Sequence, residues 1–276
     1  MNAHPFRRAL VCWSGALLVL VLVSGCATAP DLGDAEAVAE FKEIGDPGEP
    51  TNRAIFGFNR FLDTLILKPL ASGYRNFPNA VQRSVYNFLN NLRSPVIFFN
   101  DILQGNPNRA GTTLARFIIN STVGIVGLGD VADGMGFAFH NEDFGQTLAV
   151  WGVGDGPYVM LPIFGPSNPR DAVGLVADFF ADPLNLWLRN IGYESVIVAR
   201  GGLRGVDERA RNFDALDDLE RSSLDFYAAI RSLYRQRRAD QISDGKGSAI
   251  LPAPTLGGEE PRFPTPVPEG EVSEAN

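Results

Sequence analysis

Apolar residues recur at three- and four-residue steps through the first part of the chain, as one face of a helix requires. The pattern begins near Glu49 and includes Ile55, Phe58, Phe61, Leu62, Leu65 and Ile66. We expect this helix to end at Lys68-Pro69, because the residue before a proline avoids the helical region. Pro78 is expected to open a second helix, and Ser94-Pro95 to restart a short, very apolar one.

Two asparagine-proline pairs, Asn106-Pro107 and Asn168-Pro169, mark further helix starts. The asparagine side chain accepts a hydrogen bond from the first turn, and the proline lacks an N–H that the helix would leave unpaired. The helix after Pro169 is expected to run toward Pro183. Two charged helices follow, at roughly 194–213 and 217–240, so the pattern predicts a mainly α protein.

Helical periodicity fails between Asn120 and Pro169, where glycines are frequent. Phe137 and Phe139 alternate with small residues there, and the segment "TLAVWGVG" has the apolar character of a strand. We therefore expect short strands or a small hairpin in this Gly/Pro-rich region.

The N-terminus resembles a bacterial lipoprotein leader. Arg7 and Arg8 precede an uncharged apolar run that is shorter than the roughly 20 residues of a membrane span. The run ends in Val23-Ser24-Gly25-Cys26, which resembles a lipobox whose cysteine is lipidated and becomes the first mature residue. An ordinary signal peptide and an uncleaved anchor are the alternatives. The predicted division is a leader (1–25), a tether after lipidated Cys26 (26–48), a helical domain (49–241) and a disordered Pro/Gly/Glu-rich tail (242–276).

Charge and cysteine content narrow the function. The formal net charge is −8 at pH 7, and loss of the leader arginines makes the mature chain more acidic, which disfavours nucleic acid as a partner. Cys12 lies inside the leader. The mature chain therefore has one cysteine and no internal disulfide.

The sequence offers little catalytic chemistry. His140 is the single histidine after the leader, and with Glu142 and Asp143 it makes a weak candidate for a metal site; a polar loop histidine is the better interpretation. The glycines of "GVGDGP" lack the strand, helix and downstream acid of a dinucleotide loop. No G-x-S-x-G motif occurs. We expect no enzyme activity, no metal and no cofactor.

The helices near the N-terminus are unusually apolar. In "AIFGFNRFL" and "VIFFNDIL" the apolar residues spread around much of the helix. Such a helix is either fully buried or faces lipid. A packed core and lipid contact are therefore both open interpretations.

Four longer segments resemble the MlaA/VacJ family of outer-membrane lipoproteins. They are "DPGEPTNRAIFGFNRFLD", "FLNNLRSPVIFFNDILQGNPNRAGTTLARFIINSTVGIVGLGDVAD", "FGQTLAVWGVGDGPYVMLPIFGPSNPRD" and "SSLDFYAAIRSLYRQRR". The resemblance covers about Asp46 to Arg238. Pro50-Thr51 departs from the expected glycine and aromatic residue.

The resemblance implies a ring of short amphipathic and apolar helices embedded in the outer membrane from its periplasmic side, around an amphipathic channel. It implies that the protein removes mislocalised phospholipids from the outer leaflet and so maintains lipid asymmetry. The implied partners are phospholipid, a trimeric outer-membrane porin and a soluble periplasmic lipid carrier resembling MlaC. A structural, porin-associated lipoprotein without transport activity is the alternative, and a phospholipase is a distant third.

The resemblance also supplies site candidates. The segment "NRAIFGFN" matches a family motif near the channel that influences its gating, so the channel candidates are Asn52, Arg53, Phe58 and Asn59. Ordinary helix packing and capping is the alternative role. Backbone broken by Gly and Pro at membrane depth must face protein or water. The candidates for the channel mouth are therefore Phe137, Phe139, Trp151 and Tyr158.

Overall fold

A computed structural model describes residues 44–244. The predicted leader 1–25, the lipidation candidate Cys26, the tether as far as residue 43 and the tail beyond Asp244 lie outside the described residues. In chain order the elements are α3 (Glu49–Leu62), the π-helical segment η1 (Asp63–Leu67), α4 (Lys68–Tyr74), α5 (Asn79–Leu103), α6 (Pro107–Thr122), α7 (Val131–Gly134), α8 (Phe144–Val150), β1 (Val159–Leu161), β2 (Gly165–Ser167), α9 (Pro169–Ala181), α10 (Pro183–Asn190), α11 (Glu194–Arg211), α12 (Phe213–Ser222) and α13 (Phe226–Ile242).

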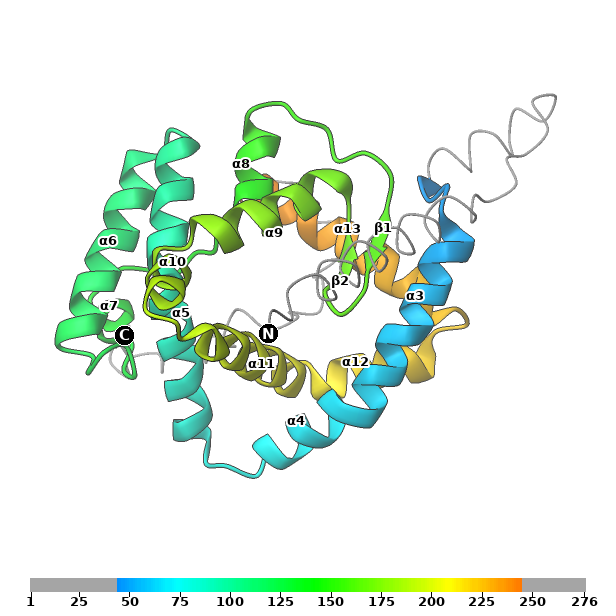
Figure 1. The fold of residues 1–276 in the computed structure, drawn as a ribbon, viewed down its shortest axis with the longest axis horizontal. Coiled ribbons are helices and arrows are strands. Elements are labelled where there is room, and N and C mark those ends of the chain that lie inside the picture. Colours follow the sequence, from blue (N-terminus) through cyan, green and yellow to red (C-terminus); the bar gives the residue numbers. More distant parts are fainter. Residues whose placement is uncertain (1–43, 245–276) are drawn as a thin grey trace, which may run out of the picture.

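The helices form a ring (Figure 1). The chain runs from α3 through α4 to the α5–α6 pair, crosses to α8 and the β1–β2 hairpin, and returns through α9, α10 and α11. α13 lies beside the hairpin and contacts α8, so residues far apart in sequence close the ring. The expected mainly α fold with one small hairpin is confirmed.

The expected helix end at Lys68-Pro69 is wrong. Lys68 keeps a helical conformation, with φ −61° and ψ −46°, and the chain stays helical from Glu49 to Tyr74. The wider π turn of η1 ends at Leu67, two residues before Pro69. Such a turn accommodates the bulk of the proline ring and the hydrogen bond that proline cannot donate.

The expected restart at Ser94-Pro95 is also wrong, because α5 continues through Pro95. Ser94 Oγ donates to the Asn90 carbonyl at 3.3 Å, and Asn100 Nδ2 donates to the Val96 carbonyl at 3.0 Å. The neighbouring turns therefore remain satisfied although proline supplies no N–H. The expected opening at Pro78 is confirmed, since Pro78 is the residue before the first helical position.

Both asparagine-proline starts are confirmed. The Asn106 side chain accepts from the Arg109 backbone N–H at 3.3 Å, and the Asn168 side chain accepts from that of Asp171 at 2.8 Å. These side chains satisfy first-turn donors that have no partner inside the helix.

Two other expectations need correction. The strand expected in "TLAVWGVG" is wrong: its first four residues end α8 and the rest follow the helix as a turn and irregular chain. Asp143 caps α8 by accepting from the Gln146 N–H at 2.9 Å. The single helix expected at 217–240 is divided into α12 and α13. Asp225 caps α13 by accepting from the Ala228 N–H at 3.2 Å. An aspartate cap thus begins a helix at 144 that apolar periodicity did not reveal, and another restarts the helix at 226 after a break that periodicity did not reveal.

A close backbone approach joins α8 to α9. A side chain at Gly174 would place its Cβ only 2.3 Å from the backbone nitrogen of Gly145. Glycine therefore permits α9 to pack directly on the first turn of α8.

Burial in the described chain is inverted relative to a typical water-soluble domain. More polar and charged side chains than apolar ones are fully buried. Conversely, many large apolar side chains are exposed, including Leu65, Phe99, Ile118, Val173 and Trp187. The one apolar core cluster found among the described residues is small and contains Tyr158, Met160 and Tyr227. Extensive exposed apolar surface of this kind marks an interaction with lipid or another protein.

Candidate functional site

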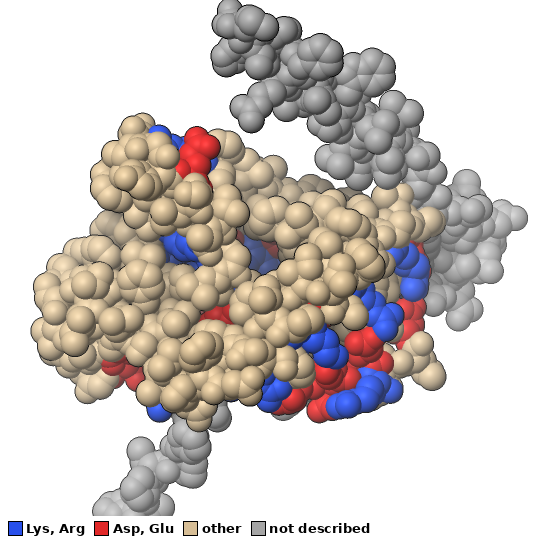
Figure 2. All heavy atoms as spheres, turned by 60° about the horizontal axis from the view of Figure 1, so that its bottom comes forward, with Lys and Arg blue, Asp and Glu red and all other residues tan. Residues whose placement is uncertain are grey.

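The ring surrounds a cavity of about 1010 Å³. Its wall is built by α5, the β1–β2 hairpin, α9, α11 and α13, with contributions from α10 and α12. Figure 2 shows some charged atoms recessed between the elements of the ring. Charged side chains therefore contribute to the interior of the cavity.

Part of the cavity wall is apolar. The apolar residues of α9 that line it are also partly open to solvent: Leu175, Val176, Phe179 and Phe180. Phe164 adds an exposed aromatic ring from the hairpin. Apolar side chains facing an open cavity suit a ligand with hydrocarbon.

The α13 side of the wall holds a paired cation. Arg238 donates through both Nη atoms to the Asp143 carboxylate at 2.7 Å, and its Nε lies 2.7 Å from Asp171 Oδ2. Burial alone would raise the pKa of Asp143, but the hydrogen bonds and charge of Arg238 outweigh it and hold this pKa well below its usual range. Asp143 precedes α8 and Asp171 lies in the first turn of α9, so Arg238 joins the starts of two helices to α13.

The α11 side contains two more paired cations. Arg200 forms an ion pair with Asp182 and donates to Asn185 Oδ1 at 3.0 Å. Arg204 donates to Glu208 at 2.8 Å, one turn further along α11. These pairs leave little net charge on that part of the wall.

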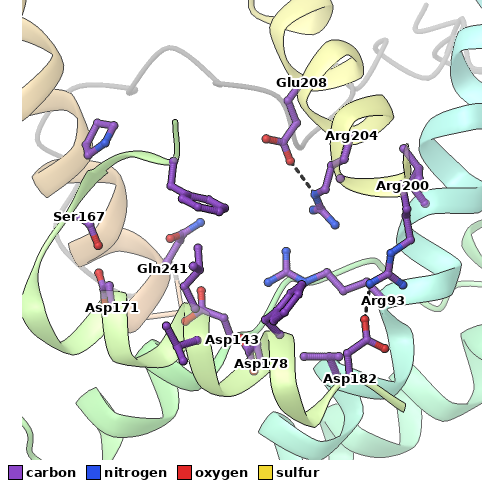
Figure 3. Close-up of a pocket in the computed structure, with 18 of the residues that line it drawn as sticks. Arg93, Asp143, Ser167, Asp171, Asp178, Asp182, Arg200, Arg204, Glu208 and Gln241 are labelled. Carbon is purple, nitrogen blue, oxygen red and sulfur yellow. Dashed lines mark hydrogen bonds and ion pairs between the residues drawn. The ribbon is translucent and has the colours of Figure 1, made fainter. Parts of the chain in front are cut away.

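Arg93 differs from these arginines. It projects from α5 into the cavity (Figure 3), on the same helix face as Leu89 and Val96. Its one hydrogen bond among the described residues is a long one, 3.5 Å to the Glu142 carbonyl, and it forms no ion pair within residues 44–244. Burial and the charge of Arg204 lower the pKa of Arg93.

The first two channel candidates from the sequence lie on α3. Asn52 is buried and holds β1, accepting from the Met160 N–H at 2.9 Å and donating to the Tyr158 carbonyl at 3.1 Å. Arg53 points elsewhere: it donates to Glu49 at 2.7 Å and pairs with Asp225.

Asn59 repeats the Asn52 arrangement two helical turns later. It donates to the Leu161 carbonyl at 2.9 Å and accepts from the Ile163 N–H at 2.7 Å. Phe58 is about half exposed on the same helix. The two asparagines therefore hold the hairpin that carries Phe164 and Pro166 into the cavity wall.

The channel-mouth candidates are dispersed. Phe137 and Phe139 contact Arg116, whose guanidinium donates to the Phe137 carbonyl and lies over the Phe139 ring. Trp151 Nε1 donates to the Leu103 carbonyl at 2.9 Å, and Tyr158 is buried in the small apolar core. None of the eight candidates is among the residues that line the cavity, and their roles in gating or at a channel mouth stay predictions.

His140 lies in a polar cluster outside the cavity wall. Its Nε2 is 3.0 Å from both Asp101 carboxylate oxygens and 3.1 Å from Thr113 Oγ1. A catalytic triad uses the two ring nitrogens for different partners, whereas here one nitrogen faces both. The arrangement links α5, α6 and the segment before α8. In the described part of the chain, no group of three or more His, Cys, Asp or Glu side chains is placed to hold a metal ion.

The outer surface separates charge from apolar area. Figure 2 shows the charged side chains gathered toward one edge of the visible face. Ion pairs join α12 to α3 through Arg60–Glu220, to α4 through Lys68–Asp217 at 2.8 Å, and to the end of α4 through Arg75–Asp214 at 2.7 Å. Across residues 44–244, no helix combines the length and apolar character of a membrane span.

The charged residues of the cavity are not among the site residues expected from the sequence. Arg93 stands alone among apolar turns of α5, four residues after Leu89 and three before Val96. On α11, Ile197, Gly201, Arg204 and Glu208 share the same spacing. A lone arginine on an apolar helix face was the available signal.

Comparison with known proteins gives one consistent result. Residues 44–241 match the family model described as "MlaA lipoprotein". The chain is 35% identical over 219 residues to the "Intermembrane phospholipid transport system lipoprotein MlaA" of Escherichia coli K12, covering 78% of this chain and 84% of that protein. It is 32% identical over 236 residues to the protein of the same name from Haemophilus influenzae, covering 84% and 90%.

A solved structure is also similar. It comes from work described as "Structural basis for maintenance of bacterial outer membrane lipid asymmetry". The TM-score is 0.63 at 36% sequence identity, covering 71% of this chain and 98% of the other.

Proposed function

The chain belongs to the MlaA lipoprotein family, and from that premise we propose that it transports phospholipid between membranes and maintains the lipid asymmetry of the outer membrane. The observation that carries the proposal is the cavity inside the ring, which presents apolar α9 side chains and charged groups to the same space. A phospholipid has both kinds of surface.

The cavity lowers the barrier that a lipid headgroup meets. A charged headgroup entering hydrocarbon loses its water, at a cost that grows steeply without polar partners. Arginines and carboxylates replace part of that hydration along the α11 and α13 sides of the wall. Leu175, Val176 and Phe180 provide a surface for acyl chains on α9. Movement through such a passage needs no bond to be made or broken, in keeping with a transport family rather than an enzyme class.

The location follows from the outer surface and the leader. We place the 49–241 domain in the outer membrane, embedded from the periplasmic side of that membrane. The reason is that large apolar side chains are exposed while polar ones are buried. Cys26 would carry the lipid anchor after removal of residues 1–25, with 26–48 as tether. Each buried CH₂ of an acyl chain contributes about 0.8 kcal/mol, so several chains hold the protein to the bilayer.

Partners complete the proposal. A passive passage has no energy source, so a soluble periplasmic carrier must take the lipid away. A trimeric porin is proposed as the neighbour in the membrane, against part of the exposed apolar surface. The gating roles of Asn52, Arg53, Phe58 and Asn59 are proposed on the same basis, with the two asparagines acting through the hairpin.

The test compares a null strain with strains complemented by wild type or Cys26→Ala. The readout is phospholipid exposed at the cell surface, measured by amine labelling of intact cells. We expect the null strain to accumulate surface phospholipid, wild type to restore the low level, and Cys26→Ala to restore it poorly. Equal surface phospholipid in the null and wild-type strains would contradict transport and favour a structural, porin-associated lipoprotein.

A further inference from the structure

Two of the arginines that line the cavity, Arg93 and Arg237, have no ion-pair partner among residues 44–244, and Figure 3 shows Arg93 directed into the cavity. Arg200, Arg204 and Arg238 each have a carboxylate within ion-pair distance. Arg93 has none in the part of the chain that the structure describes, and its single hydrogen bond there is 3.5 Å long. A half-buried guanidinium without a counter-charge is costly, so its position on the cavity wall requires an explanation.

The nearby carboxylates are committed to other groups. Asp143 accepts two hydrogen bonds from Arg238 at 2.7 Å. Asp178 accepts from the Phe144 N–H at 3.0 Å and from Asn100 Nδ2 at 3.1 Å. Both acids contribute attraction at a distance, but neither forms an ion pair with Arg93 within residues 44–244.

A second cation faces the same space. Arg204 reaches in from α11, and Figure 3 shows both guanidinium groups directed into the cavity, opposite Asp143 and Asp171. The two positive charges repel each other across the cavity. An anion between them would remove that repulsion and supply the counter-charge that Arg93 lacks.

We propose that Arg93, assisted by Arg204, binds the phosphodiester group of a phospholipid inside the cavity. This inference rests on the proposed transport function and adds the chemical group that is recognised and the residue that recognises it. Guanidinium is planar, weakly hydrated and always charged, and its paired N–H donors match two oxygens of one phosphate. The phosphodiester is common to all glycerophospholipids. This contact therefore recognises glycerophospholipids as a class and does not distinguish their terminal headgroups.

The surrounding wall fits the rest of the lipid. Val96 flanks Arg93 on α5, and Leu175, Val176 and Phe179 line the cavity from α9. A phosphate held by Arg93 would therefore have apolar side chains within the same cavity for its acyl chains.

The test measures binding of three probes to full-length protein in amphipol. Dihexanoylphosphatidylglycerol carries phosphodiester and acyl chains, dihexanoylglycerol lacks the phosphodiester, and glycerophosphoglycerol lacks the chains. Arg93→Gln is expected to weaken phosphatidylglycerol binding about tenfold, the effect of losing a charged hydrogen-bonding partner. Dihexanoylglycerol binding should not change. Arg83→Gln is the matched control, since Arg83 is exposed on the same helix and does not line the cavity.

The outcomes separate this inference from the proposed function. If wild type and Arg93→Gln bind phosphatidylglycerol equally, the Arg93 site is wrong while transport stands. If glycerophosphoglycerol binds as tightly as the lipid, a soluble phosphate ester is the ligand and the site is again wrong. If wild type binds no phospholipid, the proposed function itself fails.

A measurement on unaltered protein covers the case in which the Arg93 variant does not fold. Phenylglyoxal modifies accessible arginines, and mass spectrometry reads the extent at each site. We expect dihexanoylphosphatidylglycerol to protect Arg93, dihexanoylglycerol not to protect it, and Arg83 to react equally throughout. Unchanged modification of Arg93 at saturating phosphatidylglycerol would overturn the proposal.

Discussion

Two arginines line the same cavity in opposite circumstances. Arg238 on α13 lies between Asp143 and Asp171, with contacts of 2.7 Å to each. Arg93 on α5 has one long hydrogen bond and no ion pair among the described residues. The comparison teaches that paired charges hold this ring closed, whereas the unpaired charge is available to a ligand.

The difference has a physical cause. Removing one partner of a buried ion pair leaves an uncompensated charge, which is strongly destabilising. Removing a cation that never had a partner relieves a desolvation cost instead. Residues that close the ring and residues that contact cargo should therefore separate in stability measurements, although they occupy the same wall.

The largest expected effect is on Arg238. Arg238→Gln should lower the free energy of unfolding by about 3–5 kcal/mol, because two carboxylates lose their cation. Arg93→Gln should leave it unchanged or raise it. Chemical denaturation in detergent, followed by circular dichroism, measures both. Equal losses in the free energy of unfolding of the two variants would contradict the distinction between a paired Arg238 and an unpaired Arg93.

The next effect concerns the contact between α8 and α9, which brings Asp143 and Asp171 together. Gly174→Ala should destabilise the protein by about 3 kcal/mol, since the new Cβ meets backbone at 2.3 Å. Gly111→Ala is the control, because nothing lies within 4 Å of its Cβ position in α6. That control should stabilise by about 0.5–1 kcal/mol through helix propensity. Destabilisation of both variants to the same degree would show that close packing at Gly174 is not the cause.

A smaller effect is expected at the hairpin. Asn59→Ala removes one donor and one acceptor that hold Leu161 and Ile163, at a cost of about 1 kcal/mol. Hydrogen exchange should therefore accelerate at the Ile163 amide, while the α13 amides keep their protection. Unchanged exchange at Ile163 would mean that Asn59 does not hold the hairpin.

The smallest expected effect is a change with pH in the stability difference between wild type and Arg238→Gln. The pKa of Asp143 is held below its usual range, so its contribution to stability is present above about pH 4 and is lost as pH falls further. In Arg238→Gln burial dominates and the pKa of Asp143 rises. The stability gap between wild type and this variant should therefore narrow below about pH 4. A gap that is constant from pH 7 to pH 3 would contradict the pairing.

Local signals in the sequence predicted much of the fold. Asn106 and Asn168 identified helix starts because capping depends on a side chain and its own first turn. The hairpin was expected from the failure of helical periodicity. Pro69 and Pro95 were wrongly expected to mark helix boundaries. A π turn before Pro69 and side-chain hydrogen bonds around Pro95 keep the helices continuous.

The cavity was less accessible to sequence reasoning. Arg238 meets Asp143 across 95 residues and Asp171 across 67, and no local pattern specifies such pairs. Arg93 can be identified as a cavity residue only once α11 and α13 are known to lie opposite α5. The asparagines of α3 were singled out by resemblance, yet their contact with the hairpin emerged only from the structure.

The most direct test of the account fills the passage and measures transport. Val176 lines the cavity from α9, whereas Val173, one turn earlier, is exposed and outside the lining. Val176→Trp and Val173→Trp are introduced separately into the null strain, with folding checked by circular dichroism, and surface phospholipid is measured on intact cells. We predict that Val176→Trp leaves surface phospholipid at the null level while Val173→Trp restores the wild-type level. Full restoration by a folded Val176→Trp protein would contradict the claim that phospholipid passes through this cavity.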